Sequence, residues 1–228
     1  MIESLWEEIP RFFTYYNCVF LLEATARTLT LTGIGCLIGF ALGFYLAVAR
    51  LYPGMMFLPL RAGIIFYVEF FRRVPFLVTL MLIFFFCQGF RLEVSVFTVA
   101  LITVCLIAGS YTAEIVRAGF ESVHHTQWEA GEVMNFSLGQ KLRFVVIPQA
   151  WKVILPPAFS FFIAFIKDTA LASQIGVVEL TYVGKVFNNK GFSPVLAFGA
   201  ILVLYYLISY PLARFGVWME KRLVLSKH

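Results

Sequence analysis

Charged residues are scarce in this sequence. Only 14% of its 228 residues are charged, 61% are hydrophobic and the mean hydropathy is +0.85, whereas an ordinary soluble domain has roughly 25% charged residues. A water-soluble fold could not hide so much apolar surface. The scarcity of charge therefore excludes an ordinary soluble protein and indicates a membrane protein.

Sequence motifs that carry enzymatic chemistry are also lacking. The nearest candidate for a phosphate-binding loop, Gly184 followed by Lys185, lacks the upstream glycine spacing and the hydroxyl residue that would hold magnesium. There is no nucleophile elbow, no HExxH helix and no dinucleotide-binding glycine pattern. The four cysteines form no CxxC pair. We therefore predict no catalytic residue, no metal site and no cofactor in this chain.

Long apolar stretches are what the sequence has instead. About 20 such residues are needed to cross a bilayer as a helix, and several uncharged stretches reach or approach that length. They are residues 28–49, 74–90, 94–113, 153–166 and 191–213. We predict an all-α membrane protein with about five transmembrane helices, which together form a single domain over residues 1–228.

The basic residues predict the orientation of these helices. They fall between spans one and two, between spans three and four, and after span five, and cytoplasmic loops are the ones enriched in Lys and Arg. They are Arg50, Arg61, Arg72, Arg73, Arg117, Lys141, Arg143, Lys152, Arg214, Lys221, Arg222 and Lys227. The N-terminus is therefore expected outside and the C-terminus inside. Because the charges form no continuous patch, nucleic-acid binding is not expected.

A polar stretch over residues 126–148 interrupts the apolar sequence. Thr126 and Glu129 have the spacing of a capping box, which predicts a helix that begins at Gln127 and continues to residue 134. Asn135 tolerates the left-handed conformation that ends many helices. By the positions of the basic residues, this loop lies in the cytoplasm.

A second short helix is predicted directly after the first. Ser137 and Gln140 repeat the capping-box spacing, and the helix should stop near Pro148. The first helix carries Trp128 and Glu129, together with further apolar residues, and an amphipathic helix of this kind suits a groove in another protein. The sequence thus predicts a cytoplasmic helix pair that contacts a partner.

The segment EAGEVMNFSLGQKLRFVVIP resembles the cytoplasmic signature loop of the permeases of binding-protein-dependent ABC importers. That loop begins Glu-Ala-Ala, has glycine six residues after the glutamate, and ends in an aliphatic residue and proline. In this chain the positions are Glu129, Ala130, Gly131, Asn135, Ile147 and Pro148. Gly131 and Asn135 depart from the pattern, and asparagine is the next best residue for a left-handed turn.

Further blocks resemble the polar amino-acid branch of that family, the histidine, glutamine and arginine permeases. They are residues 67–78, 110–123 and 147–173, so the resemblance extends from about residue 20 to about residue 222. It implies a permease subunit that moves polar amino acids into the cytoplasm across the bacterial cytoplasmic (inner) membrane. The helix at 127–134 would then be the coupling helix.

The resemblance also implies partners. The coupling helix would contact a cytoplasmic ABC ATPase dimer, which binds ATP and magnesium. Other partners would be a second permease subunit, of the same chain or a paralogue, and a periplasmic or lipid-anchored substrate-binding protein, besides the amino-acid substrate and membrane lipid. The residues implied in ATPase coupling are Thr126, Gln127, Trp128, Glu129, Ala130, Gly131, Asn135 and Pro148.

Polar residues near the spans are candidates for the substrate path. Charges inside a membrane are costly and usually functional, and the candidates are Glu114, Lys167, Asp168, Thr169, Ser173 and Gln174. Structural roles compete with this interpretation. Glu114 can pair with Arg117 at three-residue spacing, and Lys167 with Asp168 can cap the end of span four.

An alternative function stays open on the residues alone. The chain could be a channel or a stand-alone secondary carrier whose cytoplasmic loop is a regulatory docking site. Such carriers often contain internal inverted repeats, and none is evident in this sequence. Five spans instead suit a half-size subunit that needs a second copy or a paralogue.

Overall fold

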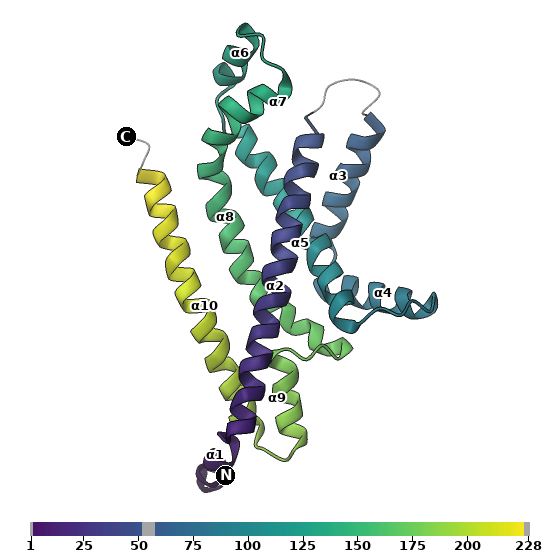
Figure 1. Ribbon diagram of the computed structural model, residues 1–228, viewed down its shortest axis with the longest axis vertical. Helices are drawn as coiled ribbons and strands as arrows, with labels where there is room; N and C mark the ends of the chain where they lie inside the picture. The colour runs from purple at the N-terminus through teal and green to yellow at the C-terminus, as the bar shows by residue number, and fades with distance from the viewer. Residues whose placement is uncertain (1, 52–57, 226–228) are drawn as a thin grey trace. The chain divides into compact units, whose positions relative to one another are not determined.

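The computed structural model describes residues 2–51 and 58–225, and these are helical with short connections (Figure 1). Lys227, one of the residues used to predict the orientation, lies outside the described residues. The helices are α1 (Ile2–Phe12), α2 (Tyr15–Ala49), α3 (Leu58–Arg73), α4 (Phe76–Gly89), α5 (Val96–Glu121), α6 (His125–Val133), α7 (Leu138–Lys141), α8 (Ile147–Asp168), α9 (Leu180–Asn189) and α10 (Pro194–Leu225). A π-helical turn, η2 (Leu142–Val146), directly precedes α8, and a 3₁₀ helix, η3 (Thr169–Ile175), directly follows it.

Four helical stretches in the described part of the chain are long and apolar enough to cross a membrane, namely Tyr15–Ala49, Val96–Glu121, Leu138–Ile175 and Pro194–Leu223. A fifth is possible only as a pair, because α3 and α4 pass the same test together but are bent by 111°. The prediction of an all-α membrane protein with about five spans is therefore confirmed. The predicted second span, residues 74–90, needs correction, because α4 alone has 14 residues and is too short to cross.

Several spans are longer than the uncharged stretches that predicted them. α2 begins at Tyr15, not at residue 28, and contains Glu23 and Arg27. α5 continues past residue 113 to Glu121. The physical reason is that a charge ends a hydrophobic run without ending a helix, because Glu and Arg are good helix formers.

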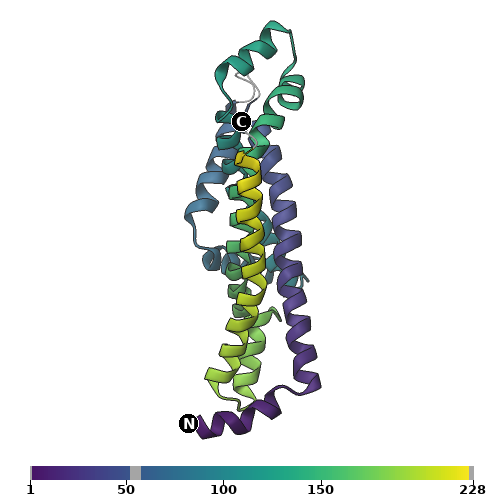
Figure 2. The ribbon, with the colours of Figure 1, turned by 90° about the vertical axis from the view of Figure 1, so that its left-hand side faces the viewer.

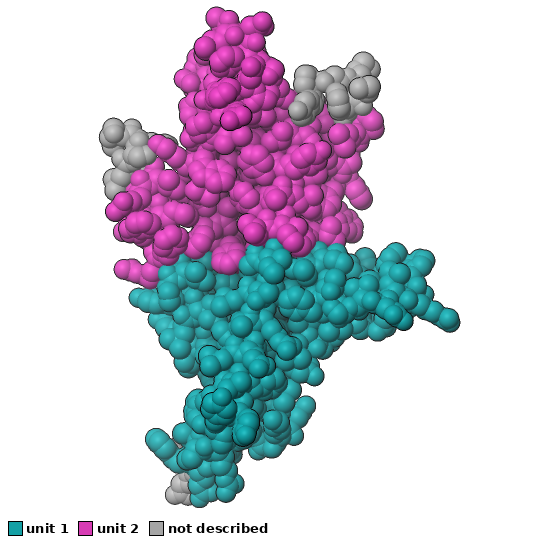
Figure 3. Space-filling view, viewed as in Figure 1, with its two compact units in different colours: residues 1–35, 76–104, 163–212 teal, residues 36–75, 105–162, 213–228 magenta. Residues whose placement is uncertain are grey.

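The chain divides into two compact units, shown in different colours in Figure 3. Unit 1 comprises residues 1–35, 76–104 and 163–212, and unit 2 comprises residues 36–75, 105–162 and 213–228. The long helices α2, α5, α8 and α10 each contribute to both units, so the units are not successive segments of the chain.

The core of unit 1 is built where α9 packs against α10. Figures 1 and 2 both show α9 beside the first half of α10, and Leu180, Val183 and Phe187 of α9 are buried with Ala197 and Ile201 of α10. Burial of each large apolar side chain contributes about 1.5–3 kcal/mol relative to water, which explains why the amphipathic α9 lies here.

The core of unit 2 depends on close approach between α2 and α5. A Cβ added at Gly39 would lie 2.5 Å from Cβ of Ala108, and one at Gly43 would lie 2.5 Å from the carbonyl oxygen of Gly109. The helix backbones can approach this closely only because these positions lack side chains. Gly39 and Gly43 therefore serve helix packing in this unit.

Candidate functional site

The polar loop forms the helix pair α6–α7 in unit 2, but the first helix begins earlier than predicted. α6 starts at His125, and its N-cap is His124, whose Nδ1 accepts a hydrogen bond from the backbone N–H of Thr126 at 3.4 Å. The predicted capping box at Thr126 and Glu129 is therefore wrong. Thr126 lies in the first turn, where its hydroxyl is 2.9 Å from Nδ1 of His124, so it supports the cap instead of forming it.

The turn between the two helices agrees with the sequence. Asn135 has a φ of +55°, in the left-handed region where Asn is tolerated better than most residues. Ser137 and Gln140 form both bonds of a capping box: Ser137 Oγ accepts from the backbone N–H of Gln140 at 3.4 Å, and Gln140 Oε1 accepts from that of Ser137 at 2.8 Å. These three residues fix the angle at which α7 leaves the turn.

The second helix does not stop near Pro148, which is a further correction. α7 passes through the π-helical turn η2 into α8, which contains Pro148 as its second residue. Proline lacks a backbone N–H, and the helical path continues through it from the wider π-helical turn directly before it, in which the backbone N–H of Ile147 donates to the carbonyl of Leu142. The stretch from Leu138 to Ile175 is thus one long helical passage.

The helix pair is braced against the core of unit 2. Leu142 and Val146 are buried with Val116 and Phe120 of α5. Lys141, the last residue of α7, reaches back to α6, where its Nζ lies 2.9 Å from Glu132 Oε1. The two contacts hold α6 and α7 in a fixed relation to α5.

Packing explains why residue 131 is a glycine, which the sequence did not reveal. It is buried, and a Cβ at this position would lie 2.8 Å from Cγ of Lys141. The missing side chain lets the aliphatic stem of Lys141 lie across α6 on its way to Glu132. The glycine therefore serves the contact between the two helices.

The residues implied in coupling divide into inward and outward groups. Trp128 is half-buried and packs against the unit 2 core, while Gln127 is exposed and accepts a hydrogen bond from Gln149 Nε2 at 3.2 Å. Glu129 and Ala130 are exposed. Beyond them, at the end of α6, Val133 is 88% exposed and Met134 is 64% exposed. The outward face of the pair thus combines a carboxylate with two large apolar side chains.

A charge cluster surrounds Glu114 of α5, also within unit 2. Arg117 donates from Nε and Nη2 to the two carboxylate oxygens at 3.0 and 2.6 Å, which confirms the predicted pairing. Arg72 Nη1 lies 3.6 Å and Arg50 Nη1 3.9 Å from the same carboxylate. The carboxylate therefore joins α5 to α3 and to the end of α2, and Arg117 also contacts Glu121.

The other substrate-path candidates lie at the end of α8 and in η3, within unit 1. Lys167, Asp168 and Gln174 are exposed, whereas Thr169 and Ser173 are buried. Asp168 is the N-cap of η3, where its side chain makes no cap hydrogen bond; whether Lys167 and Asp168 line the substrate path or cap the end of span four stays a prediction.

The two buried hydroxyls in this segment have different surroundings. Thr169 donates to the carbonyl of Ile166 at 2.8 Å and lies 3.3 Å from the hydroxyl of Thr32. Ser173 Oγ has no hydrogen-bond partner among the described residues. Glu114 belongs to unit 2 and the remaining five candidates to unit 1.

Glu179 was not predicted from the sequence, and it is the most completely buried acidic residue among those whose burial the structure describes. Its side chain is 0% exposed and caps α9, accepting from the backbone N–H groups of Thr181 at 2.9 Å and Tyr182 at 2.8 Å. The hydroxyl of Tyr205 in α10 donates to it at 2.9 Å. Burial raises the pKa of the Glu179 carboxyl, and these hydrogen bonds oppose the shift. Glu is not among the preferred N-cap residues, so its sequence position gave only a weak signal.

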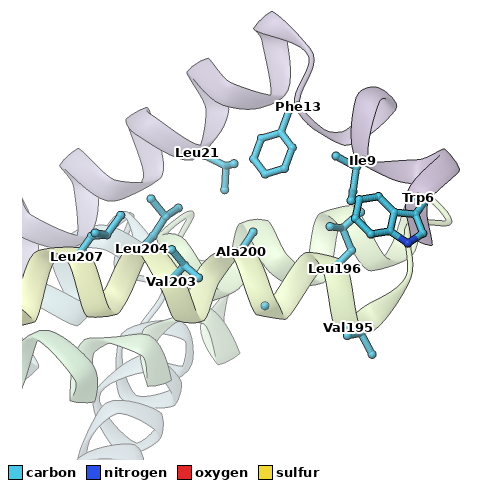
Figure 4. Close-up of a pocket in the computed structure, with 11 residues that line it drawn as sticks. Trp6, Ile9, Phe13, Leu21, Val195, Leu196, Ala200, Val203, Leu204 and Leu207 are labelled. Atoms are coloured by element: carbon cyan, nitrogen blue, oxygen red, sulfur yellow. The ribbon is translucent and has the colours of Figure 1, made fainter. Parts of the chain in front are cut away.

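An apolar groove of about 670 Å³ lies in unit 1 between α1, the start of α2 and α10 (Figure 4). The side chains lining it are aliphatic or aromatic, among them Trp6, Phe13 and Leu204. An amino acid carries an ammonium and a carboxylate, which need polar partners when they leave water. The groove therefore does not suit such a ligand.

The chain matches a known family over most of its length. The family model described as a binding-protein-dependent transport system inner membrane component matches residues 39–224. The chain is 34% identical over 197 residues to the L-cystine transport system permease protein TcyB of Bacillus subtilis (strain 168), covering 86% of this chain and 83% of that protein. It is 30% identical over 222 residues to the glutamine transport system permease protein GlnP of Escherichia coli (strain K12), covering 96% of each.

Solved structures agree with the sequence relatives. A chain in the crystal structure of an amino acid ABC transporter with histidines superposes with a TM-score of 0.83 at 26% identity, over 91% of this chain and 95% of that one. The MetNI methionine ABC transporter in an inward-facing conformation gives a TM-score of 0.77 at 20% identity, over 92% and 99%, which shows a shared fold. The chain belongs to the family of inner-membrane components of binding-protein-dependent transport systems, as an ABC transporter permease.

Proposed function

We propose that this chain is the transmembrane subunit of an ATP-driven importer that moves polar amino acids or related small molecules into the cytoplasm. The substrate class is supported by the names of its relatives, which include L-cystine and glutamine permease proteins. A separate ATPase dimer would bind ATP and magnesium. A second permease subunit and a substrate-binding protein outside the membrane would complete the transporter.

The proposal rests on a single observation, the rigid construction of the α6–α7 pair. Transmitting movement requires a contact that does not bend, and the pair has a fixed turn at Asn135, a capping box at Ser137 and a buried brace at Leu142. Its outward face presents Val133 and Met134 to a partner. An ordinary connecting loop needs none of these features.

The proposed mechanism is a rigid-body movement. Closure of the two ATPase subunits around ATP would shift the α6–α7 pairs seated on them. Because Leu142 and Val146 anchor the pair to α5, the shift would reach the spans and rock the two permease subunits between inward-facing and outward-facing forms. Substrate would enter from the binding protein in the outward-facing form.

Glu129→Ala tests the coupling role. Glu129 lies on the exposed face of α6 and is not part of the N-cap, so its removal should change stability by less than about 0.5 kcal/mol. In the reconstituted complex, we expect the variant to insert normally and to lose the coupling between ATP hydrolysis and amino-acid uptake. The matched control is Glu93→Ala, which removes an exposed glutamate from the connection between α4 and α5.

Two results would contradict the proposal. Normal coupled uptake by Glu129→Ala would remove Glu129 from the contact with the ATPase. Substrate flux through the purified chain without any ATPase would instead favour the channel or stand-alone carrier. The amino acids that stimulate ATP hydrolysis in the same complex would identify the substrate.

A further inference from the structure

A second cavity, of about 250 Å³, lies in unit 2 and is lined by basic residues. Arg50 follows the end of α2, Arg61 comes from α3, and Arg117 comes from α5. The rest of the wall is Glu121, Trp128 of α6 and the apolar residues Ala47, Leu51 and Phe120. The cavity is several times the roughly 30 Å³ that one water molecule occupies, so a small anion has room in it.

The charges around this cavity are unbalanced. Glu121 is paired with Arg117, and Glu114 is shared among three arginines, of which Arg50 is the most distant at 3.9 Å. Arg61 is exposed and has no ion pair among the described residues. Arg117 is already paired with Glu114 and Glu121, so the positive charge without a close partner at this space comes from Arg61 and Arg50, and an anion would compensate it.

We propose that this cavity binds a phosphate group, supplied by the headgroup of an anionic phospholipid. Guanidinium groups bind phosphate oxygens in a bidentate manner, more specifically than ammonium groups do. The cavity lies where the apolar run of α2 ends at Ala49, which is where lipid headgroups meet a membrane helix. Basic pockets between transmembrane helices are known to hold acidic headgroups.

The proposed site has a structural consequence for α6. Trp128 lines the cavity and also packs against the core of unit 2. A bound headgroup would therefore touch α6, the C-terminal end of α2 and the beginning of α3. It would favour the arrangement in which these three elements surround it. This inference concerns lipid binding and is independent of how the helix pair serves transport.

Lipid binding can be measured directly on the full chain. We would strip the purified protein of lipid in detergent, add phosphatidylglycerol or phosphatidylcholine, and count retained molecules by native mass spectrometry. The wild type should retain phosphatidylglycerol preferentially. Arg61→Gln should weaken that retention about fivefold, because one basic residue near an anionic headgroup contributes about 1 kcal/mol. Arg61→Lys should restore part of it.

A matched control separates the site from general charge effects. Arg214 of α10 is also exposed and lies outside the cavity, so Arg214→Gln should retain phosphatidylglycerol as the wild type does. Equal retention by Arg61→Gln and wild type would overturn the proposal, as would an equal loss in Arg214→Gln.

Inorganic phosphate distinguishes the source of the anion. If millimolar phosphate leaves phosphatidylglycerol bound, the site takes the lipid, as proposed. If phosphate displaces the lipid and raises the unfolding temperature of the wild type but not of Arg61→Gln, the site is a phosphate site filled from solution, and the assignment to lipid is overturned.

Discussion

Each unit contains a glutamate that is buried or half-buried, and the partners of the two glutamates differ in charge. In unit 1, the partners of Glu179 among the described residues are neutral: two backbone N–H groups and hydroxyls. In unit 2, Glu114 is surrounded by arginines from α3, from α5 and from the residue that follows α2. The Glu179 carboxylate fixes the backbone at the start of α9. The Glu114 carboxylate instead joins elements that are distant in sequence, through long arginine side chains that can exchange partners.

The surroundings of Glu179 are therefore expected to be more rigid than those of Glu114. Loss of the Glu179 contacts would leave backbone groups of α9 unpaired inside the protein, which is expensive. The Glu114 cluster can rearrange at lower cost, because its members keep partial access to water, with 24% of the Glu114 side chain exposed. Two substitutions and a pH titration test this difference between the two glutamates.

Replacement of Glu179 should have the largest effect. Glu179→Ala removes a helix cap, worth about 1 kcal/mol. It also leaves the half-buried Tyr205 hydroxyl with only the Thr181 hydroxyl, 3.2 Å away, as a partner, at a cost of about 1–2 kcal/mol. We expect a total loss of about 2–3 kcal/mol, measured as a lower unfolding temperature in detergent. Tyr205→Phe removes only one partner and should cost about 1 kcal/mol. An Ala variant as stable as the wild type would show that the cap is unimportant.

Replacement of Glu114 should have a smaller effect. Glu114→Ala leaves three arginines with reduced compensation, but because the cluster is partly hydrated we expect a loss of about 1–2 kcal/mol, below the 3–5 kcal/mol of a fully buried pair. The control is Glu69→Ala, which breaks the exposed Glu69–Arg73 pair and should cost less than about 1 kcal/mol. Equal losses in both variants would contradict the view that Glu114 joins helices.

The pH dependence of stability should show the smallest effect and should come from Glu179. Its pKa is raised in the folded protein by burial, so between the ordinary value of about 4.3 and the raised value the folded state binds more protons than the unfolded state. Stability contributed by the protonated form is thus present below pH 4.3 and is lost as pH rises through the raised pKa. Glu179→Gln should flatten this part of the curve of unfolding temperature against pH. An unchanged slope would assign it to another group.

Much of the helix pair could be predicted from sequence, because its determinants are local. Ser137 and Gln140 are three residues apart, and the conformation of Asn135 depends on its own side chain. Thr126 was misassigned because His124 and Thr126, two residues apart, can each accept a bond from the same first turn. The π-helical turn that carries α7 into α8 depends on the burial of Leu142 and Val146, which capping patterns do not contain.

The partners of the two glutamates could not be predicted, because they are distant in sequence. The pairing with Arg117 could be predicted because Arg117 lies on the same helix as Glu114, whereas Arg72 lies on α3 and Arg50 follows α2. Glu179 reaches Tyr205 across the contact between α9 and α10. Hydrophobic patterns locate helices but do not specify which polar residues meet between them.

The central claim is that the end of α6 contacts an ATPase, and site-specific photo-cross-linking tests it most directly. A photoreactive amino acid would replace Met134, which is 64% exposed, or Leu92, which is 50% exposed in the connection between α4 and α5. In membranes containing the assembled transporter, we predict a cross-link to the ATPase from position 134 and none from position 92. Absence of a cross-link at position 134, or an equal cross-link from position 92, would contradict the account.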